Sequence, residues 1–264
     1  MDQLDHVLDQ PDLEARDLAS LDVLSYGGAP MPFAVIRQAI ERLPKSVGFV
    51  NAFGQTETTS TLTVLGPDDH RLEGTAEEIE ARTRRLRSIG RPLPDVEVRV
   101  VDDDGTLLAV GQVGEIHVRT PRAMKGYAGA SDSPFTTDGW LPTRDLGWLD
   151  EDGYLYVAGR KDDMIIRGGE NIAPAEVEAV LGSHPAVEEV AVVGVPDVEW
   201  GQRVAACVVL RPGGRASAEE LSGFCRERLA SFKKPEVIRF FPELPKNPMG
   251  KLLRRELRVL LEAS

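Results

Sequence analysis

The apolar and polar positions before residue 90 alternate between strand-like runs and one helix-like stretch. VLSYGG (23–28) is a short apolar run ending in a glycine pair, which predicts a buried strand that leads into a turn. Pro32 follows, and proline suits the first turn of a helix. The apolar residues of that helix recur at helical spacing and are expected to form its core face: Phe33, Ile36, Ile40 and Leu43.

A second strand, SVGFVNAF (46–53), runs into the polar stretch NAFGQTETTS (51–60). Within a few positions this stretch holds an aromatic residue, a glycine, amides, hydroxyls and one carboxylate. It is typical either of a threonine-rich turn or of a site that holds a charged ligand. A strand followed by a sharp polar loop is also the arrangement that places ligands at the carboxyl ends of strands in α/β sheets.

Beyond residue 90 the pattern changes to period-two alternation. Residues 96–120 alternate apolar and polar positions around two glycine-containing turns, DDDG and GQVG. This pattern predicts antiparallel hairpins in a small barrel or sheet. We interpret DDDG (102–105) as a hairpin turn and not as a metal site, because carboxylates around one glycine are common turn chemistry.

A charged run marks the expected domain boundary. The strand YLYVAG (154–159) ends in Arg-Lys-Asp-Asp (160–163), and a second short strand, MII, ends at Gly168 and Gly169. We place the boundary between residues 161 and 162, which gives domains 1–161 and 162–264. The second has about 100 residues, a normal size for a small domain. The expected fold class is α/β (α+β).

The C-terminal domain has its own strand and helix pattern. A helix is expected from Pro174, with Val177, Val180 and Leu181 inside, followed by the strands VEEVAVVGVP and QRVAACVVL. Ser217 to Glu220 form a predicted capping box. The helix it opens should bury Leu221, Phe224, Cys225 and Leu229. Cys225 on that face and Cys207 in a strand are therefore expected to be core thiols.

Composition and charge exclude several classes of protein. At 42% hydrophobic and 28% charged residues, the chain has the composition of a globular protein. Its net charge of −12 argues against nucleic acid as a partner. The sequence shows no apolar run of membrane-spanning length and no signal-peptide pattern, and two cysteines suit a reducing cytoplasm. The basic groups RTRRLR (82–87) and KLLRREL (251–257) are expected to be solvated helix faces.

Five signatures, in this order, resemble one family. They are YGGAP, NAFGQTE, SIGRPLP, TRDLGWLDEDGYLYVAGRKDDMIIRGGENIAPAEVE and PKNPMGKLLRREL. Together they resemble the adenylate-forming enzymes, which include acyl-CoA synthetases, firefly luciferases and peptide-synthetase adenylation domains. RGGENIAPAEVE looks like the acyl-CoA synthetase branch. The resemblance implies the remainder of a large AMP-binding domain, with part of an α/β sheet and a small β-barrel, followed by a compact, mobile C-terminal α/β domain.

The resemblance implies a first half-reaction in which a carboxylate attacks the α-phosphate of MgATP, giving an acyl-adenylate and pyrophosphate. Glu57 matches the family carboxylate that holds Mg²⁺, and Thr56 would hydrogen-bond a phosphate oxygen. Lys251 matches the lysine that bridges the attacking carboxylate and the α-phosphate. These three would be the catalytic residues.

The resemblance also implies an adenosine site. Phe53 matches the aromatic residue that stacks on adenine, and Asn51 would lie at the adenine edge. Asp145 matches the aspartate that accepts both ribose hydroxyls, and Arg160 matches the arginine that also contacts the ribose. The same signatures add small residues to the cofactor-binding set: Gly28, Ala29, Pro30, Ala52 and Gly54.

For the second half-reaction the family rotates its C-terminal domain, and the thiol of coenzyme A then attacks the acyl group. Asp162 matches the hinge of that rotation. Gly168 and Gly169 match a glycine loop that lines the pantetheine tunnel, where side chains would block the thiol. The expected function is an AMP-forming acyl-CoA synthetase of the fatty-acid–CoA ligase type, an acid–thiol ligase of fatty acid metabolism. The alternatives are an adenylation enzyme that loads a carrier protein and a catalytically inactive nucleotide-binding scaffold.

One signature of the family is missing from these residues. The Ser/Thr/Gly-rich phosphate loop ending in Pro-Lys does not occur in the sequence. We therefore expect a fragment, a split subunit or a truncated product that is inactive in adenylation by itself. Exposed core surface on residues 1–90 would be covered by the missing N-terminal half or by self-association.

Overall fold

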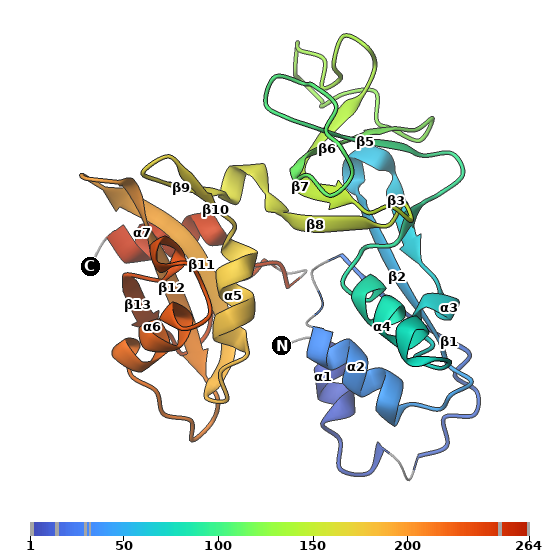
Figure 1. Cartoon of the computed structure of the whole chain (residues 1–264), viewed down its shortest axis with the longest axis horizontal. Coiled ribbons are helices and arrows are strands. Elements are labelled where there is room, and N and C mark those ends of the chain that lie inside the picture. The colour runs from blue at the N-terminus through green and yellow to red at the C-terminus, as the bar shows by residue number, and fades with distance from the viewer. Residues whose placement is uncertain (1–2, 14–15, 29–30, 32, 248–249, 263–264) are drawn as a thin grey trace. The chain divides into compact units, whose positions relative to one another are not determined.

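The computed structural model describes residues 3–13, 16–28, 31, 33–247 and 250–262. The chain divides into two compact units, Met1–Val157 and Ala158–Ser264, and Figure 1 shows the elements of each. The division falls inside strand β8 (Leu155–Arg160), ahead of the boundary predicted between residues 161 and 162.

The N-terminal unit begins with a four-stranded sheet in the order β1-β2-β3-β4. Its strands span Val23–Gly27 (β1), Gly48–Gln55 (β2), Ser60–Leu65 (β3) and Arg91–Pro92 (β4). β1 and β2 are parallel, whereas β3 is antiparallel to β2 and β4. The helices of this part are α1 (Gln3–Leu8), α2 (Phe33–Arg42), α3 (Pro67–His70) and α4 (Ala76–Arg85).

The first predicted strand and helix are confirmed, with one difference in burial. Ile36 and Leu43 are buried, and Phe33 and Ile40 pack partly buried against the same core, which Phe49 of β2 joins. β1 is not the buried strand that was predicted, because Val23 is 56% exposed. The reason is that, among the described strands, β1 lies at the edge of this sheet beside β2.

A second four-stranded sheet, in the order β5-β6-β7-β8, completes the unit. β5 (Glu97–Val101), β6 (Gly114–Arg119) and β7 (Leu141–Leu149) are successive antiparallel neighbours, which confirms the predicted hairpins. The described strands form an open sheet, so the expected closed barrel is not found among them. Leu62 of β3 packs in one core with Ile116 and Leu155, which joins the two sheets.

The DDDG segment is a turn, as predicted. Asp102 Oδ1 accepts hydrogen bonds from the backbone nitrogens of Asp104 and Thr106, at 3.0 and 2.8 Å. Gly105 has a φ of 82°, a conformation that favours glycine. The Asp102 carboxylate therefore shapes the connection between β5 and β6.

The C-terminal unit is built on the three-stranded sheet β11-β12-β13. β11 (Val187–Asp197) and β12 (Gly201–Leu210) are antiparallel, and β13 (Val237–Phe240) is parallel to β12. α5 (Pro174–Gly182) and α6 (Ala218–Arg226) pack on one face, and α7 (Arg254–Glu262) packs on the other. The unit also holds the hairpin of β9 (Ile165–Arg167) and β10 (Glu170–Ile172), and the short 3₁₀ turns η3 (Lys161–Asp163) and η4 (Ser231–Lys233).

Burial on both faces explains the almost unbroken apolar run of β12. Val204, Ala206 and Val208 face the core beneath α5 and α6. Ala205, Cys207 and Val209 face the core beneath α7. The predicted helix from Pro174 and both predicted strands are confirmed, and Ser217 caps α6 by accepting a hydrogen bond from the backbone nitrogen of Glu220 at 3.1 Å.

Both cysteines are core thiols, as predicted. Cys207 and Cys225 are fully buried and free, and burial raises the pKa of each thiol to about 11. Because the thiolate is the reactive form, neither should react with a disulfide reagent at pH 8 in the folded chain. We expect both to react within minutes in 6 M guanidinium, measured by release of the coloured thiol, while fast reaction of the native chain would contradict this packing.

The expectation of solvated helix faces fits Arg84 in the first basic group and fails at Arg254 in the second. Arg84 is exposed on α4 and pairs with Glu80 one turn earlier, as a solvated face would. Arg254, in contrast, forms a two-point ion pair with Glu178 and donates to the carbonyl of Val192 at 2.6 Å. The KLLRREL prediction is therefore wrong at Arg254, because this arginine lies where α7 begins against β11.

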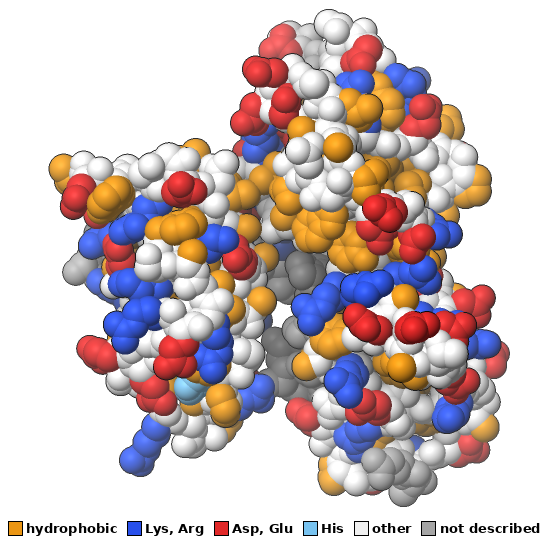
Figure 2. Space-filling view, viewed as in Figure 1, with side chains coloured by type: hydrophobic (Ala, Val, Ile, Leu, Met, Phe, Trp, Pro, Cys, Tyr) orange, Lys and Arg blue, Asp and Glu red, His pale blue; other side chains and the backbone are white. Residues whose placement is uncertain are grey.

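The surface is mixed in character. Figure 2 shows acidic, basic and apolar side chains interspersed on the face that it draws of each unit. In the part of the chain that the structure describes, helices are too short and too polar to cross a bilayer.

Candidate functional site

The glycine pair of β1 and the polar stretch of β2 lie side by side at one edge of the first sheet. In the parallel pairing, Tyr26 is opposite Asn51, and Gly27 is opposite Ala52. A Cβ atom on Gly27 would lie 2.1 Å from the carbonyl oxygen of Ala52, so only glycine fits there. Gly28 follows with a φ of 78°. Of the predicted neighbours, Ala29 and Pro30 lie outside the described residues.

The polar stretch is not the loop that was predicted. β2 continues through Asn51, Ala52, Phe53 and Gly54 to Gln55, and only then does the chain turn, in the 3₁₀ turn η2 (Thr56–Thr58). Phe53 is partly buried against the core that joins the two sheets. Gly54 is essential to the close approach of β3, because a Cβ atom there would lie 1.8 Å from the carbonyl oxygen of Ser60.

The turn after β2 has a strained backbone. Thr59 and Ser60 have φ values of 53° and 83°, which non-glycine residues rarely adopt. Thr58 is fully buried, and its hydroxyl donates to the carbonyl of Gln55 at 3.1 Å. Such strain concentrates at functional sites, where surrounding contacts hold it in place. The turn holds Thr56 on the surface and the carboxylate of Glu57 partly buried.

Residues far along the chain hold this turn, and sequence reasoning missed them. The backbone nitrogen of Met124 donates to the carbonyl of Glu57 at 2.7 Å, and the Thr59 hydroxyl donates to the carbonyl of Arg122 at 2.8 Å. The hydroxyl of Tyr127 donates to Oε1 of Glu57 at 3.1 Å. These residues lie in an irregular connection with no period, so the sequence pattern carries no signal for the contacts.

Asp145 lies in a β-bulge of the second sheet. Glu115 pairs with Leu146 and His117 pairs with Pro142, so Thr143, Arg144 and Asp145 lie opposite the single residue Ile116. Arg144 has a φ of 62°, and the backbone nitrogen of Asp145 donates to the Thr143 hydroxyl at 3.1 Å. Bulges commonly re-aim side chains beside functional sites. Asp145 is only 6% exposed, and a carboxylate is rarely so buried unless it has a partner.

Tyr26, beside the glycine pair, is fixed by a buried histidine. Nδ1 of His70 lies 2.7 Å from the carbonyl of Gly66 and must donate to it, so Nε2 accepts from the Tyr26 hydroxyl at 2.9 Å. Burial lowers the pKa of His70, and burial raises that of Tyr26. Both groups are therefore neutral at pH 7.

This pair predicts a pH dependence of stability. A histidine whose folded pKa lies below its unfolded value of about 6.5 contributes stability above pH 6.5 that is lost as the pH falls through the folded pKa. The free energy of unfolding should therefore fall below pH 6.5, by up to about 1.4 kcal/mol per pH unit more than in His70→Gln. Urea unfolding at pH 5 to 7 measures this difference, with His184→Gln as the control. Equal slopes in the chain and in His70→Gln would contradict the role of His70.

In the C-terminal unit, Arg160 ends β8 and Asp162 lies in η3. The neighbouring Asp163 is held within the unit by ion pairs of 3.5 Å to Arg254 and to Arg258 of α7. The residue next to the predicted hinge is therefore tied to the C-terminal helix.

Gly168 and Gly169 form the tip of the β9–β10 hairpin. Their φ values of 58° and 87° are those of a tight two-residue hairpin turn, and Gly168 donates to the carbonyl of Trp200 at 2.8 Å. A Cβ atom on Gly168 would lie 2.7 Å from the ring of Trp200, which is 43% exposed. The predicted glycine loop is thus a narrow strand tip against an aromatic side chain.

Lys251 is exposed at the end of a compact turn before α7. Its backbone nitrogen donates to Oδ1 of Asn247, and the Asn247 nitrogen donates to the Lys251 carbonyl, both at 2.9 Å. Gly250 has a φ of 81°. Pro248 and Met249 of the same signature lie outside the described residues. The turn fixes the backbone of Lys251 and leaves its long side chain at the surface.

Two family models match the chain. The model described as AMP-binding enzyme matches residues 2–128, and the model described as AMP-binding enzyme C-terminal domain matches residues 176–251. The first match ends before Asp145 and the second begins after Gly169. The predicted site residues from Asp145 to Gly169 therefore lie between the two matches.

Relatives and solved structures agree with these models. A fatty acid–acyl-carrier-protein ligase of Streptomyces coeruleorubidus is 40% identical over 96% of this chain and 47% of its own length. A 2-succinylbenzoate–CoA ligase of Bacillus cereus (strain Q1) is 41% identical over 92% of this chain and 47% of its own length.

The o-succinylbenzoate CoA synthetase of Bacillus subtilis, solved with its acyl-adenylate intermediate, has a TM-score of 0.81 and 37% identity over 97% of this chain and 49% of its own. An amide bond synthetase of Marinactinospora thermotolerans has a TM-score of 0.85 and 36% identity over 97% of this chain and 50% of its own. The chain thus spans about half the length of the relatives that it matches.

Proposed function

Because the chain belongs to the adenylate-forming enzyme superfamily, we propose that it functions in an AMP-forming acyl-CoA synthetase of the fatty-acid–CoA ligase type. In the first step a carboxylate oxygen of the acid bonds to the α-phosphorus of ATP, and pyrophosphate leaves. In the second step the sulfur of coenzyme A bonds to the acyl carbon, its proton goes to solvent or a base, and AMP leaves. The location would be the cytoplasm, which suits two free, buried cysteines.

The observation that carries this proposal is the end of β1, where Gly27 pairs with Ala52 of β2. There, Gly27 and Gly28 leave backbone exposed beside Asn51 and Ala52, and the next turn presents Thr56 and Glu57. We assign Phe53 and Asn51 to adenine, with Gly28, Ala52 and Gly54 as the small residues around them. Asp145 would accept the ribose hydroxyls, and Thr56 would donate to a phosphate oxygen. These assignments suit adenosine, because glycine backbone leaves room for the flat adenine base and a buried carboxylate can accept both hydroxyls of the ribose.

A Mg²⁺ ion fits the single carboxylate of Glu57. Mg²⁺ is commonly held by one or two carboxylates together with the phosphates of the substrate, so a cage of several acids is not required. Groups of three or more potential metal-binding side chains are absent from the described residues, which suits this shared mode. When bound there, Mg²⁺ would offset the phosphate charge that repels the incoming carboxylate.

The C-terminal unit would contribute a cation, a hinge and a thiol path. We assign Lys251 to the attacking carboxylate and the α-phosphate, because its backbone is fixed and its side chain is exposed. Arg160 would contact the ribose, and Asp162 would be the hinge. Gly168 and Gly169 would line the pantetheine path.

The acyl acceptor has one serious alternative. The relative from Streptomyces coeruleorubidus acts on an acyl-carrier protein, and it is as similar to this chain as the CoA ligases are. A carrier protein presents the same phosphopantetheine thiol, so the chemistry of the second step is unchanged.

The test is the second half-reaction, which does not require the β- and γ-phosphates. We expect the chain, supplied with a fatty acyl-adenylate and CoA, to form acyl-CoA faster than the uncatalysed mixture, with product measured by mass spectrometry. The Asp145→Asn variant, which weakens the proposed ribose acceptor, should be slower. Acylation of a phosphopantetheinylated carrier protein but not of CoA would favour the alternative acceptor. A rate no greater than background with either thiol would contradict the proposed function.

A further inference from the structure

We call the connection between β6 and β7, residues 120–140, the strap. Its contacts with the turn after β2 and with the start of β3 differ in kind. The contacts of Arg122 and Met124 fix the course of the chain: the Thr59 hydroxyl donates to the carbonyl of Arg122, the Arg122 guanidinium donates to the carbonyl of Thr61, and the Met124 nitrogen donates to the carbonyl of Glu57. The contact of Tyr127 is made to a carboxylate oxygen, Oε1 of Glu57. Tyr127 is thus the strap residue whose hydroxyl acts on the side chain proposed to bind the cation.

The strap is anchored where it begins. The Arg122 guanidinium bonds both carboxylate oxygens of Asp95, at 2.7 and 3.1 Å, and also donates to the carbonyl of Thr61 in β3 at 2.7 Å. The hydrogen bond from Arg122 lowers the pKa of Asp95, so the pair is ionic at neutral pH. One arginine therefore joins the strap to the strand that follows the turn.

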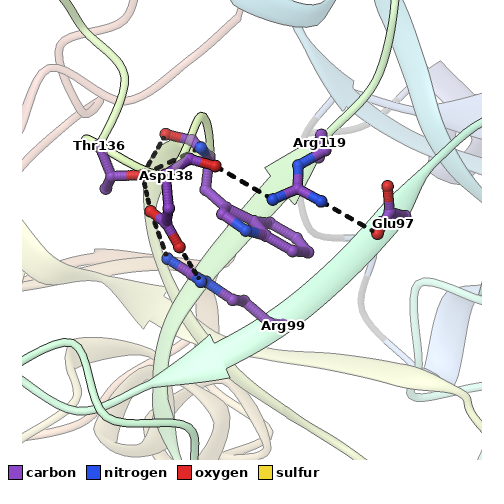
Figure 3. A network of polar contacts seen from close by, with 6 residues as sticks. Glu97, Arg99, Arg119, Thr136 and Asp138 are labelled. Carbon is purple, nitrogen blue, oxygen red and sulfur yellow. Dashed lines mark hydrogen bonds and ion pairs between the residues drawn. The ribbon is translucent and has the colours of Figure 1, made fainter.

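The strap is also anchored where it ends, as Figure 3 shows. The Trp140 ring is 8% exposed and lies between two guanidinium groups, with Arg99 at 4.5 Å and Arg119 at 4.3 Å from its centroid. Arg99 of β5 bonds both oxygens of Asp138, at 2.7 and 3.4 Å, and the Thr136 hydroxyl donates to the same carboxylate at 2.6 Å. Bonds from Arg99 and Thr136 lower the pKa of Asp138 to about 2.

Anchors at both ends limit how far the middle of the strap can move. We propose that Tyr127 is a positioning residue for Glu57: its hydroxyl holds Oε1 so that Oε2 is oriented as the ligand of the divalent cation. This inference rests on the proposed function. Mg²⁺ demands near-ideal octahedral geometry, so a carboxylate that is already oriented binds it better than one that rotates freely. Partners of this kind change metal affinity by about 10- to 100-fold when they are removed.

The test compares ATP binding with and without the cation, by calorimetry on the whole chain. For each variant we take the ratio of two dissociation constants, that of ATP in EDTA over that of ATP with saturating Mn²⁺. Tyr127→Phe removes one hydroxyl and keeps the ring. It should lower this ratio about 10-fold and leave the affinity for metal-free ATP within twofold of the unaltered chain. Tyr156→Phe is the matched control, because the Tyr156 hydroxyl also donates to a carboxylate, that of Asp150, at 3.2 Å. Its ratio should not change.

The possible results separate this inference from the proposed function. An unaltered chain that binds ATP neither with Mn²⁺ nor without it overturns the proposed function, and the inference with it. Binding of ATP that Mn²⁺ does not tighten, or a Tyr127→Phe ratio equal to that of the unaltered chain, overturns the inference alone. An equal loss of affinity for both forms of ATP in Tyr127→Phe shows a merely structural role and also overturns it.

Discussion

Replacing Asp145 with alanine is expected to weaken AMP binding to the chain by about 100-fold or more. Asp145 is 6% exposed in the bulge of β7, where it is proposed to accept both ribose hydroxyls. A hydrogen bond to a charged group contributes about 1.5–3 kcal/mol, so the loss of two amounts to about 3 kcal/mol or more. Each 1.4 kcal/mol is about tenfold in affinity.

This loss can be measured by thermal unfolding. A ligand that binds only the folded chain at 100 times its dissociation constant adds about 2.7 kcal/mol of stability, so AMP should raise the unfolding temperature of the unaltered chain much more than that of Asp145→Ala. The control is Asp102→Ala, which alters the turn between β5 and β6 and should keep the AMP response. An undiminished response in Asp145→Ala, or an equal loss in both variants, would contradict the assignment of the ribose acceptor.

Replacing Gly54 with alanine is expected to lower the free energy of unfolding of the N-terminal unit by about 3 kcal/mol or more. The added Cβ would lie 1.8 Å from the carbonyl oxygen of Ser60 and 2.9 Å from the Cα of Thr61. Both are backbone atoms, so relief requires β2 and β3 to separate, and overpacking of this kind costs about 1–3 kcal/mol even where side chains can adjust. Separation would also displace Glu57, so nucleotide binding should fall with stability.

Urea unfolding at constant pH measures the effect, and Gly66→Ala supplies the control. Gly66 follows β3 in the same unit, and an added Cβ there meets no atom within 4 Å. Its replacement should cost less than about 1 kcal/mol, the usual scale for a change at the start of a helix. If the two variants lose stability equally, the close approach of β2 and β3 at Gly54 is not what makes glycine necessary there.

Periodicity predicted those elements whose burial decides their structure. The helices from Phe33 and from Pro174, and the strands β11 and β12, pack one or both faces against a core, so their apolar spacing indicated their type. Burial of β1 was overpredicted, because an apolar run does not show how many neighbours a strand has. Alternation left a barrel or a sheet open, because it is the same in both; the barrel that the resemblance implied is not closed among the described strands.

The sequence predicted some residues of the candidate site but not the contacts that hold them. The resemblance pointed to Glu57 and Asp145, but composition and spacing alone left the stretch 51–60 open between a turn and a binding site. β2 runs through this stretch despite its polar residues because pairing with β1 and β3 overrides local preference. The contact between Tyr127 and Glu57 joins residues 70 positions apart, and the bulge at Asp145 depends on register. Neither leaves a local pattern in the sequence.

The central claim is that these residues form an adenosine site, and one titration tests it most directly. An acyl-sulfamoyl adenosine, a stable analogue of the acyl-adenylate, is titrated calorimetrically into the folded chain. The account predicts saturable binding to one site per chain, with a dissociation constant of about 1 μM or tighter, which corresponds to about −8 kcal/mol. The absence of binding to a chain that unfolds cooperatively in the same buffer would contradict it.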